Sequence, residues 1–370
     1  MPSRFRLRSA LVPIAVTLLS LVAAEAAVRV AHRIRPLYLD RPRVYHPHPQ
    51  FHHWHEPNAT STFRTVEFST RQRTNAHGMV GREVPLEKPA GVVRIGMVGD
   101  SFVEGFTTDE EESIPYRLEA RLQAAVGEGY HVLNFGSASF SPTLEYFMLR
   151  DLGGQFDLDF VVLLFHVTDV TDDARYIDSA VRNAEGEVIA IDGGTVSWAY
   201  ELATHSALLT AVTQAARALV RANVPFDLGH TFNAMFKPEY NDADRAAWAL
   251  SLSYLERIRD WCAEAGIPFL LVALPVGPQV EPVGDVHAST LGLFGDGGLL
   301  TSTRMQDTLR DWASDRGIAF LDLLPAARRY KAARPDEVLF FPRDQHFTPA
   351  GKVMAADAIF EAIVPQLTRP

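Results

Sequence analysis

The sequence predicts an α/β fold: a flavodoxin-like three-layer α/β/α sandwich around a mostly parallel five-stranded sheet. Five short apolar runs recur from residue 92 onward, and helical patterns lie between or after them. The runs are continuously apolar rather than alternating, which is typical of strands buried on both faces by helices. The predicted strands are residues 92–98, 131–136, 160–167, 269–276 and 319–324.

Six segments carry the 3.6-residue apolar period of helices, and several have recognisable ends. Asp242 is a plausible N-cap, and Gly266 is a plausible residue just beyond the end of the same helix. Thr348 as N-cap and Pro349 at the first helical position fix the start of the last helix. The predicted helices are residues 113–126, 143–152, 201–222, 242–265, 302–316 and 349–364.

Residues 91–370 form the predicted main domain, and residues 170–240 interrupt its alternation of strands and helices. We expect this insertion to contain a hairpin around Glu185 and Gly186, followed by a long helix, above the carboxyl edge of the sheet. Residues 284–298 are glycine-rich and lack hydrophobic periodicity, so we expect a mobile loop there.

The composition restricts the class of protein. With 370 residues, of which 47% are hydrophobic, the chain can bury a sizeable core. Lys plus Arg number 35 against 45 for Asp plus Glu, a net charge of −10, and no basic block is present, which argues against a nucleic-acid partner. The single Cys262 excludes an intrachain disulfide and is interpreted as a buried thiol.

The first 35 residues are predicted to lie outside the fold. Three arginines among the first eight residues precede an apolar run at residues 11–24, as in a signal peptide or a signal-anchor. Extended to residue 28, the run has 18 residues, the short end for a membrane span. Residues 24–26, Ala-Glu-Ala, would suit cleavage. We expect a single anchor with the body exported, and cleavage remains the alternative.

Residues 36–90 are rich in Pro, His and Arg, which predicts an irregular arm packed on the main domain, with a short strand at residues 60–69. Five histidines lie within residues 46–55, and histidine-dense tracts can bind metal. Their spacing fits no closed metal site, and neither Cys nor clustered carboxylates accompany them. We therefore expect a solvated or aromatic-packing segment and predict no metal.

Polar side chains follow the first three predicted strands. Ser101 lies between two glycines that permit tight turns, Ser139 follows the second strand, and Thr168 follows the third. Ligands of open α/β sheets bind beyond the carboxyl ends of the strands, so we expect these three side chains to surround one pocket. Ser101 taken alone could equally be a turn or capping residue. The other predicted pocket residues are Asp100, Gly136, His166 and Asp169.

A histidine and an aspartate precede the last helix, at His346 and Asp344. A nucleophilic serine needs a base, and an imidazole base needs a group that holds its tautomer and orientation. Asp344 is near enough in sequence to orient His346. On its own, His346 would more commonly be a loop histidine bonded to backbone.

Together these motifs resemble the SGNH (GDSL-type) hydrolases. The resemblance comprises Gly-Asp-Ser at residues 99–101, Asn-x-Gly at residues 134–136 and Asp-x-His at residues 344–346, and it spans residues 92–365. Thr-Asn-Ala-His-Gly at residues 74–78 is similar to an arm of membrane-anchored bacterial members. The resemblance implies the SGNH hydrolase fold and a reaction that uses no cofactor.

The resemblance also implies residue roles. Ser101 would be the nucleophile, His346 the general base and Asp344 the group that orients the base. The oxyanion would be held by the backbone N–H of Ser101, by that of Ser139, where the family usually has glycine, and by Thr168, where it usually has asparagine. Thr168 offers a hydroxyl but no amide, which is a departure from the family pattern.

Three functions follow as hypotheses. The first is an exported serine esterase that removes acyl groups, mainly acetyl, from a carbohydrate or related substrate. The second is an O-acetyltransferase supplied by a membrane-embedded acyl-donor protein, because the single residue between Asp344 and His346 resembles the branch that O-acetylates exported polysaccharides. The third is a non-catalytic glycan-binding module, which Thr168 supports.

The resemblance and the apolar amino terminus together predict a location. We expect a single-pass protein of the bacterial inner membrane with its catalytic domain in the periplasm, or a secreted protein if the signal is cleaved.

Overall fold

A computed structural model describes residues 3–34, 45–196, 206–213, 216, 235–281 and 302–367. Its centre is a five-stranded sheet with the order β11-β10-β7-β5-β6, in which every neighbouring pair is parallel. The predicted α/β fold with a five-stranded parallel sheet is therefore confirmed. The strands are β5 (Val93–Gly99), β6 (Tyr130–Gly136), β7 (Phe160–Phe165), β10 (Phe269–Ala273) and β11 (Ala319–Asp322).

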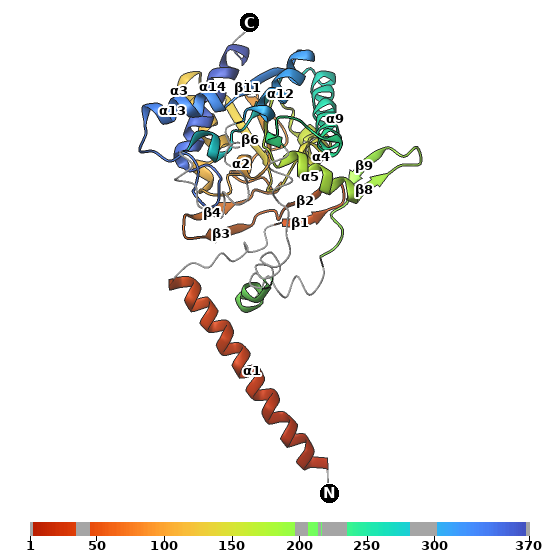
Figure 1. Ribbon diagram of the computed structural model, residues 1–370, viewed down its shortest axis with the longest axis vertical. Coiled ribbons are helices and arrows are strands. Elements are labelled where there is room, and N and C mark those ends of the chain that lie inside the picture. The colour runs from red at the N-terminus through yellow and green to blue at the C-terminus, as the bar shows by residue number, and fades with distance from the viewer. Residues whose placement is uncertain are drawn as a thin grey trace.

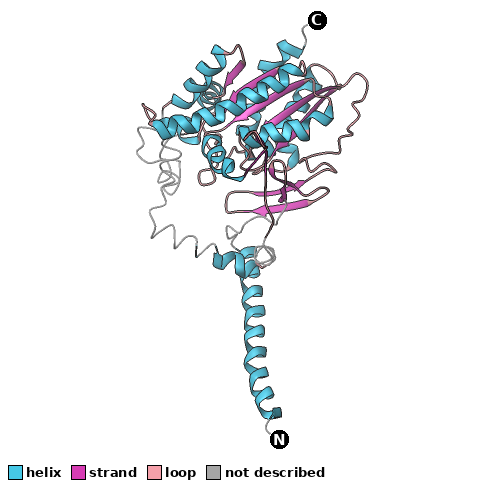
Figure 2. Ribbon diagram, turned by 90° about the vertical axis from the view of Figure 1, so that its right-hand side faces the viewer, coloured by secondary structure: helices cyan, strands magenta, loops and turns pink. Residues whose placement is uncertain are grey.

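Helices cover both faces of this sheet (Figure 2). Successive residues of β7 point into opposite cores: Val161 and Leu163 into one, Val162 and Leu164 into the other. This explains why β7 is apolar throughout. One layer contains α3 (Ile114–Ala125), α13 (Leu324–Ala333) and α14 (Pro349–Leu367); the other contains α4 (Pro142–Asp151), α5 (Asp169–Tyr176), α9 (Asp242–Glu264) and α12 (Arg304–Asp315).

The predicted helix ends are close to those observed, with one correction. The N-cap of α9 is Asn241 rather than Asp242: its Oδ1 accepts from the N–H of Asp244 at 2.8 Å, and Asp244 accepts from the N–H of Asn241 at 3.0 Å. Gly266 follows α9 with φ +69°, as predicted. Helix α13 was not predicted, because it buries only Leu324 and Ala327 and so carries little periodic signal.

The remaining helical elements are short. They are α2 (Ser101–Glu104), α10 (Gly277–Val280), η1 (Glu110–Glu112), η2 (Gly153–Phe156) and η3 (Ile177–Ser179). Of these, α2 and α10 follow β5 and β10 closely, so they lie at the carboxyl edge of the sheet.

The arm contains two antiparallel hairpins, so the prediction of irregular structure was wrong, whereas the segment predicted as a strand at residues 60–69 contains β3 and the start of β4. Strands β1 (Tyr45–His48) and β2 (His52–His55) form one hairpin, and β3 (Thr60–Arg64) and β4 (Ser69–Arg73) form the other. The inward side chains of β3 and β4 are largely polar, so the sequence shows no apolar alternation.

The histidine tract packs against aromatic rings, as one of the sequence interpretations proposed. The ring of His48 stacks on Phe51 at 3.6 Å, and His53 meets Phe140 edge-on at 5.0 Å. Within the described part of the chain, no group of three or more His, Cys, Asp or Glu residues could hold a metal ion.

The insertion contains the predicted hairpin, formed by β8 (Ala180–Arg182) and β9 (Val188–Ile191) around Gly186, whose φ is +86°. The helix predicted at residues 201–222 lies largely outside the described residues. Within the described part of that range, residues 207–213 are helical. The loop predicted at residues 284–298 lies entirely outside them.

The amino-terminal helix α1 (Ser3–Ile34) projects away from the body, and β1–β4 lie on the side of the body that faces it (Figure 1). Within it, Leu11–Ala31 is 21 residues long with a mean hydropathy of 2.2. By its length and composition this segment could cross a membrane, and a signal sequence has the same length and composition.

Candidate active site

A cavity of about 290 Å³ opens at the carboxyl edge of the sheet. Its lining contains all five residues to which the sequence analysis assigned chemical roles, together with Asp100 and His166. These residues come from segments that follow β5, β6 and β7 and from the loop before α14. The five are Ser101, Ser139, Thr168, Asp344 and His346.

The turn after β5 presents Ser101 at the start of α2. At Gly99 a Cβ would lie 2.6 Å from a methyl of Val103, so a side chain does not fit. Asp100 caps α2, its Oδ1 accepting from the N–H of Phe102 at 2.9 Å. Gly105 ends the helix with φ +89°. The serine is therefore fixed by a tight turn on each side.

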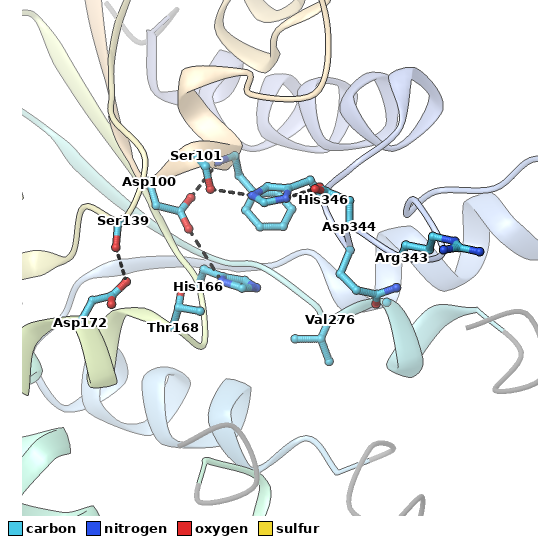
Figure 3. A pocket seen from close by; sticks show the side chains of 13 residues that line it. Asp100, Ser101, Ser139, His166, Thr168, Asp172, Val276, Arg343, Asp344 and His346 are labelled. Atoms are coloured by element: carbon cyan, nitrogen blue, oxygen red, sulfur yellow. Dashed lines mark hydrogen bonds and ion pairs between the residues drawn. The ribbon is translucent and has the colours of Figure 1, made fainter. Parts of the chain in front are cut away.

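Ser101, His346 and Asp344 form one hydrogen-bonded chain (Figure 3). Ser101 Oγ lies 2.7 Å from His346 Nε2, and His346 Nδ1 lies 2.5 Å from Asp344 Oδ1. The Asp344 side chain is 4% exposed, so water does not compete for its carboxylate. With a proton on Nδ1 held by Asp344, Nε2 is free to accept the proton of Ser101 Oγ.

The electrostatic surroundings favour the charged form of His346. Burial alone would lower its pKa, but the charge and hydrogen bond of Asp344, together with the charge of Asp100, outweigh burial, and the pKa is raised above its ordinary value. An imidazolium formed when His346 takes a proton is therefore stabilised in place.

Gln345 is the single residue between Asp344 and His346, and its backbone lets their side chains meet. Its φ is +68°, a left-handed turn between Asp344 and His346. Its side-chain Nε2 donates to the carbonyls of Phe341 at 3.1 Å and Pro342 at 2.9 Å, which holds the turn. The short Asp-x-His spacing is thus compatible with direct contact between the two side chains.

Two residues that line the cavity have backbone N–H groups available to a ligand. Among the described residues, neither Ser101 nor Ser139 donates its N–H to a protein acceptor. Ser139 has φ +66°, a conformation that glycine adopts more readily. Its hydroxyl donates to Asp172 Oδ2 at 3.0 Å and accepts from Arg175 at 2.8 Å, which holds the strained residue in place.

The Thr168 hydroxyl is shared with a neighbouring ring. Its Oγ1 lies 2.8 Å from His166 Nδ1. Burial, and then the charge of His346, lowers the pKa of His166 to about 3, so this ring is neutral at ordinary pH. A neutral ring can accept the threonine proton, and in that tautomer Thr168 has no proton left for a ligand.

Asp100 is buried beside the His166 ring. Its Oδ2 lies 3.7 Å from His166 Nδ1. Burial raises the pKa of Asp100 to about 7.

Asp172, which the sequence analysis missed, also lines the cavity. Burial raises its pKa to about 6. It lies on α5, the helix that begins directly after Thr168, so its position three residues after Asp169 was a usable signal.

Two predicted pocket residues lie behind the lining. Gly136 packs on α2, where a Cβ would lie 2.1 Å from the backbone N of Glu104. Asp169 is fully buried and accepts from the N–H of His166 at 3.0 Å, so it supports the strand end from inside. Asn75 lies outside this lining too, and its hydrogen bonds stay within the arm: Oδ1 accepts from the N–H of His77 at 2.9 Å, and Nδ2 donates to the carbonyl of Arg82 at 3.0 Å.

No protein-family model matches this chain, and no curated protein is significantly similar to it. Solved structures that are similar in fold include an acetyl xylan esterase at 13% identity and a TM-score of 0.43, covering 74% of this chain and 100% of that one. A catalytic mutant of an acetylxylan esterase from Geobacillus stearothermophilus matches at 12% identity and a TM-score of 0.43, covering 75% and 97%. A GDSL-like lipase from Bacteroides thetaiotaomicron matches at 11% identity and a TM-score of 0.37, covering 78% and 94%.

Proposed function

We propose that this chain is an SGNH hydrolase, a serine ester hydrolase that removes O-acyl groups, mainly acetyl, from a carbohydrate or related substrate. The observation that carries the proposal is the unbroken hydrogen-bonded chain Ser101–His346–Asp344 on the wall of a cavity. A serine, a base and an orienting carboxylate in mutual contact are what covalent acyl transfer requires.

In the proposed mechanism, Ser101 Oγ attacks the ester carbonyl while His346 Nε2 takes the hydroxyl proton. The tetrahedral intermediate collapses, the C–O bond to the alcohol breaks, and the histidine returns the proton to the leaving oxygen. Water then attacks the acyl-serine and gives its proton to the same nitrogen. Ser101 leaves with that proton, and the carboxylic acid is released.

The oxyanion of each intermediate would be held mainly by backbone N–H groups. Those of Ser101 and Ser139 face no protein acceptor among the described residues, and their donation does not depend on either side chain. Thr168 would contribute less, because its hydroxyl is engaged with His166. Phe102 and Val276 on the cavity walls offer apolar contact to the acyl group.

The decisive experiment uses the full chain in detergent with p-nitrophenyl acetate and a fluorophosphonate probe. We expect the wild type to hydrolyse the ester and to be labelled, and Ser101→Ala to lose labelling and at least about 10³-fold in turnover. A folded wild type that neither labels nor turns over would contradict the proposal and would favour a glycan-binding module instead. Deacetylation of an acetylated oligosaccharide then tests the substrate class.

Acyl transfer to a sugar hydroxyl is the second candidate, with a membrane acyl-donor protein as partner. It is favoured by the left-handed Gln345, which permits the short Asp-x-His spacing that resembles O-acetylating proteins. If the acyl-serine is passed to a sugar, adding an acceptor glycan should yield acylated glycan at the expense of free acetate. Release of acetate alone, whatever the glycan concentration, would leave hydrolysis as the function.

We further propose that α1 is retained as a membrane anchor, with the body in the bacterial periplasm. Glu25 accepts hydrogen bonds from Ser206 Oγ at 2.8 Å and from the N–H groups of Ala207 at 3.0 Å and Leu208 at 2.9 Å. Cleavage after Ala26 would remove these contacts. The intact mass of the membrane-extracted protein tests this: a mature chain that starts near residue 27 would exclude an anchor.

A further inference from the structure

The hairpin β3–β4 reaches from the arm to the loop that carries the base. At its tip, Glu67 Oε1 accepts from the backbone N–H of Arg343 at 2.9 Å, and Oε2 accepts from that of Asp344 at 3.0 Å. The two partners are separated from Glu67 by 276 and 277 residues. A single carboxylate thus holds two successive peptide groups, one of which belongs to the residue that orients His346.

The backbone at the tip is held by its own hydrogen bonds, so the Glu67 carboxylate extends from a fixed position. Thr65 donates its backbone N–H to the carbonyl of Phe68 at 2.8 Å. Its hydroxyl accepts from the N–H groups of Glu67 at 3.1 Å and Phe68 at 3.0 Å. Thr65 and Phe68 are both buried. These bonds close the turn and fix the backbone from which Glu67 extends.

The same hairpin also holds the segment that follows the nucleophile. Gln72 Nε2 donates to the carbonyl of Gly105, the residue that ends α2, at 2.9 Å. The ring of Phe68 packs against Phe341 at 5.1 Å and against Phe106 at 6.0 Å. Phe106 in turn lies 5.2 Å from the His346 ring. The hairpin therefore bridges the two loops that bring Ser101 and His346 together.

We propose that Glu67 is a positioning residue for the base, acting through the backbone of Arg343 and Asp344; this inference rests on the proposed function. Charge-assisted bonds to two peptide N–H groups are stronger than neutral ones, and they fix the plane from which the Asp344 side chain leaves. Glu67 lies outside the cavity lining that the described residues form, so it acts on the orientation of His346 and not on substrate. An arm without catalytic groups thereby becomes part of the active-site framework.

The test compares Glu67→Gln and Glu67→Ala with the wild type, using p-nitrophenyl acetate. Gln keeps one acceptor oxygen and Ala keeps none, so we expect kcat to fall by about 10-fold and about 100-fold respectively, with KM nearly unchanged. Loosening Asp344 weakens the contact that raises the pKa of His346. The acid limb of the pH–rate profile should therefore move to lower pH in both variants.

Glu83→Gln is the matched control. Glu83 also lies in the arm, and its carboxylate also accepts from a backbone N–H, that of Ala76, at 3.1 and 3.2 Å, away from the cavity. This control should leave kcat and the acid limb unchanged. Active sites are counted by fluorophosphonate labelling, so that unfolded protein does not lower the measured kcat. If Glu67→Ala does not fold, Glu67→Gln, which keeps the side-chain shape, decides the question.

The inference is overturned if folded Glu67→Gln matches Glu83→Gln in both kcat and pH profile while the wild type is active. Failure of the proposed function looks different, because the wild type itself would then neither turn over ester nor be labelled.

Discussion

Replacing Asp344 by asparagine tests the part of the site that most depends on electrostatics. Asp344 Oδ1 lies 2.5 Å from His346 Nδ1, and its side chain is 4% exposed, so no solvent replaces the lost charge. A carboxylate and an imidazolium about 4 Å apart attract by about 4 kcal/mol at an effective dielectric of about 20. Each ~1.4 kcal/mol is tenfold in rate, so we expect kcat to fall about 10³-fold.

A second effect acts in the same direction. An asparagine amide can donate to Nδ1, which leaves the imidazole proton on Nε2, facing Ser101 Oγ. In that tautomer His346 donates to the serine and cannot accept its proton. Since Asp344 acts through His346, KM should change little and the loss should appear in kcat.

The assay is hydrolysis of p-nitrophenyl acetate between about pH 5 and pH 8, where a histidine titrates. His346 must be neutral to act as a base, so activity should rise as pH passes its pKa, which is raised in the wild type. Removing the charge of Asp344 lowers that pKa, so the acid limb of the variant should move to lower pH. Asp159→Asn is a control, because Asp159 Oδ2 accepts from the N–H of Arg94 at 2.7 Å at the amino end of the sheet. A loss below tenfold, or an unmoved acid limb, would refute the reasoning.

Four further outcomes are expected. Thr168→Val should lower kcat by no more than about tenfold, because its hydroxyl is shared with a histidine ring, whereas loss of a full oxyanion donor costs about 10²–10³; steady-state kinetics decide. Ser139→Gly should retain kcat within about fivefold, since the N–H remains and glycine relieves a left-handed backbone, as the same assay will show. Lys352→Met should lower the free energy of unfolding in urea by about 1–3 kcal/mol, because the buried ammonium donates to the carbonyl of Gly105 and the hydroxyl of Thr108. It should also move the acid limb to higher pH, because the charge of Lys352 lowers the pKa of His346. Cys262, whose pKa burial raises to about 12, should react with iodoacetamide only after unfolding, as followed by mass spectrometry.

The sheet was predictable because its inner strands β5, β7 and β10 are buried on both faces. A continuous apolar run such as residues 160–165 indicates this burial from the local sequence alone. The arm was not predictable in the same way. The buried face of β3 and β4 includes Ser61, Thr70 and Gln72, so its strands lack the alternation that marks half-buried sheets.

The site shows the same division. Ser101 and the Asp344–His346 pair were predicted from the resemblance of their motifs to the SGNH hydrolases, because neither Ser101 nor His346 taken alone indicates catalysis. The misplaced pocket residues, Gly136 and Asp169, belong to the same strand ends, but which way a residue faces there depends on the packing of α2 and α5. Spacing along the chain cannot supply that direction.

By itself, then, the sequence determined the layers of the main domain, the order of its five sheet strands along the chain, and the residue types that follow those strands, because burial and turn geometry depend on local sequence patterns. Only the tertiary structure decided that Ser101 Oγ and His346 Nε2, 245 residues apart, lie 2.7 Å from each other, and that Glu67 holds the backbone of Asp344. These are contacts between segments distant in the chain, and their geometry follows from how the helices and the arm pack on the sheet.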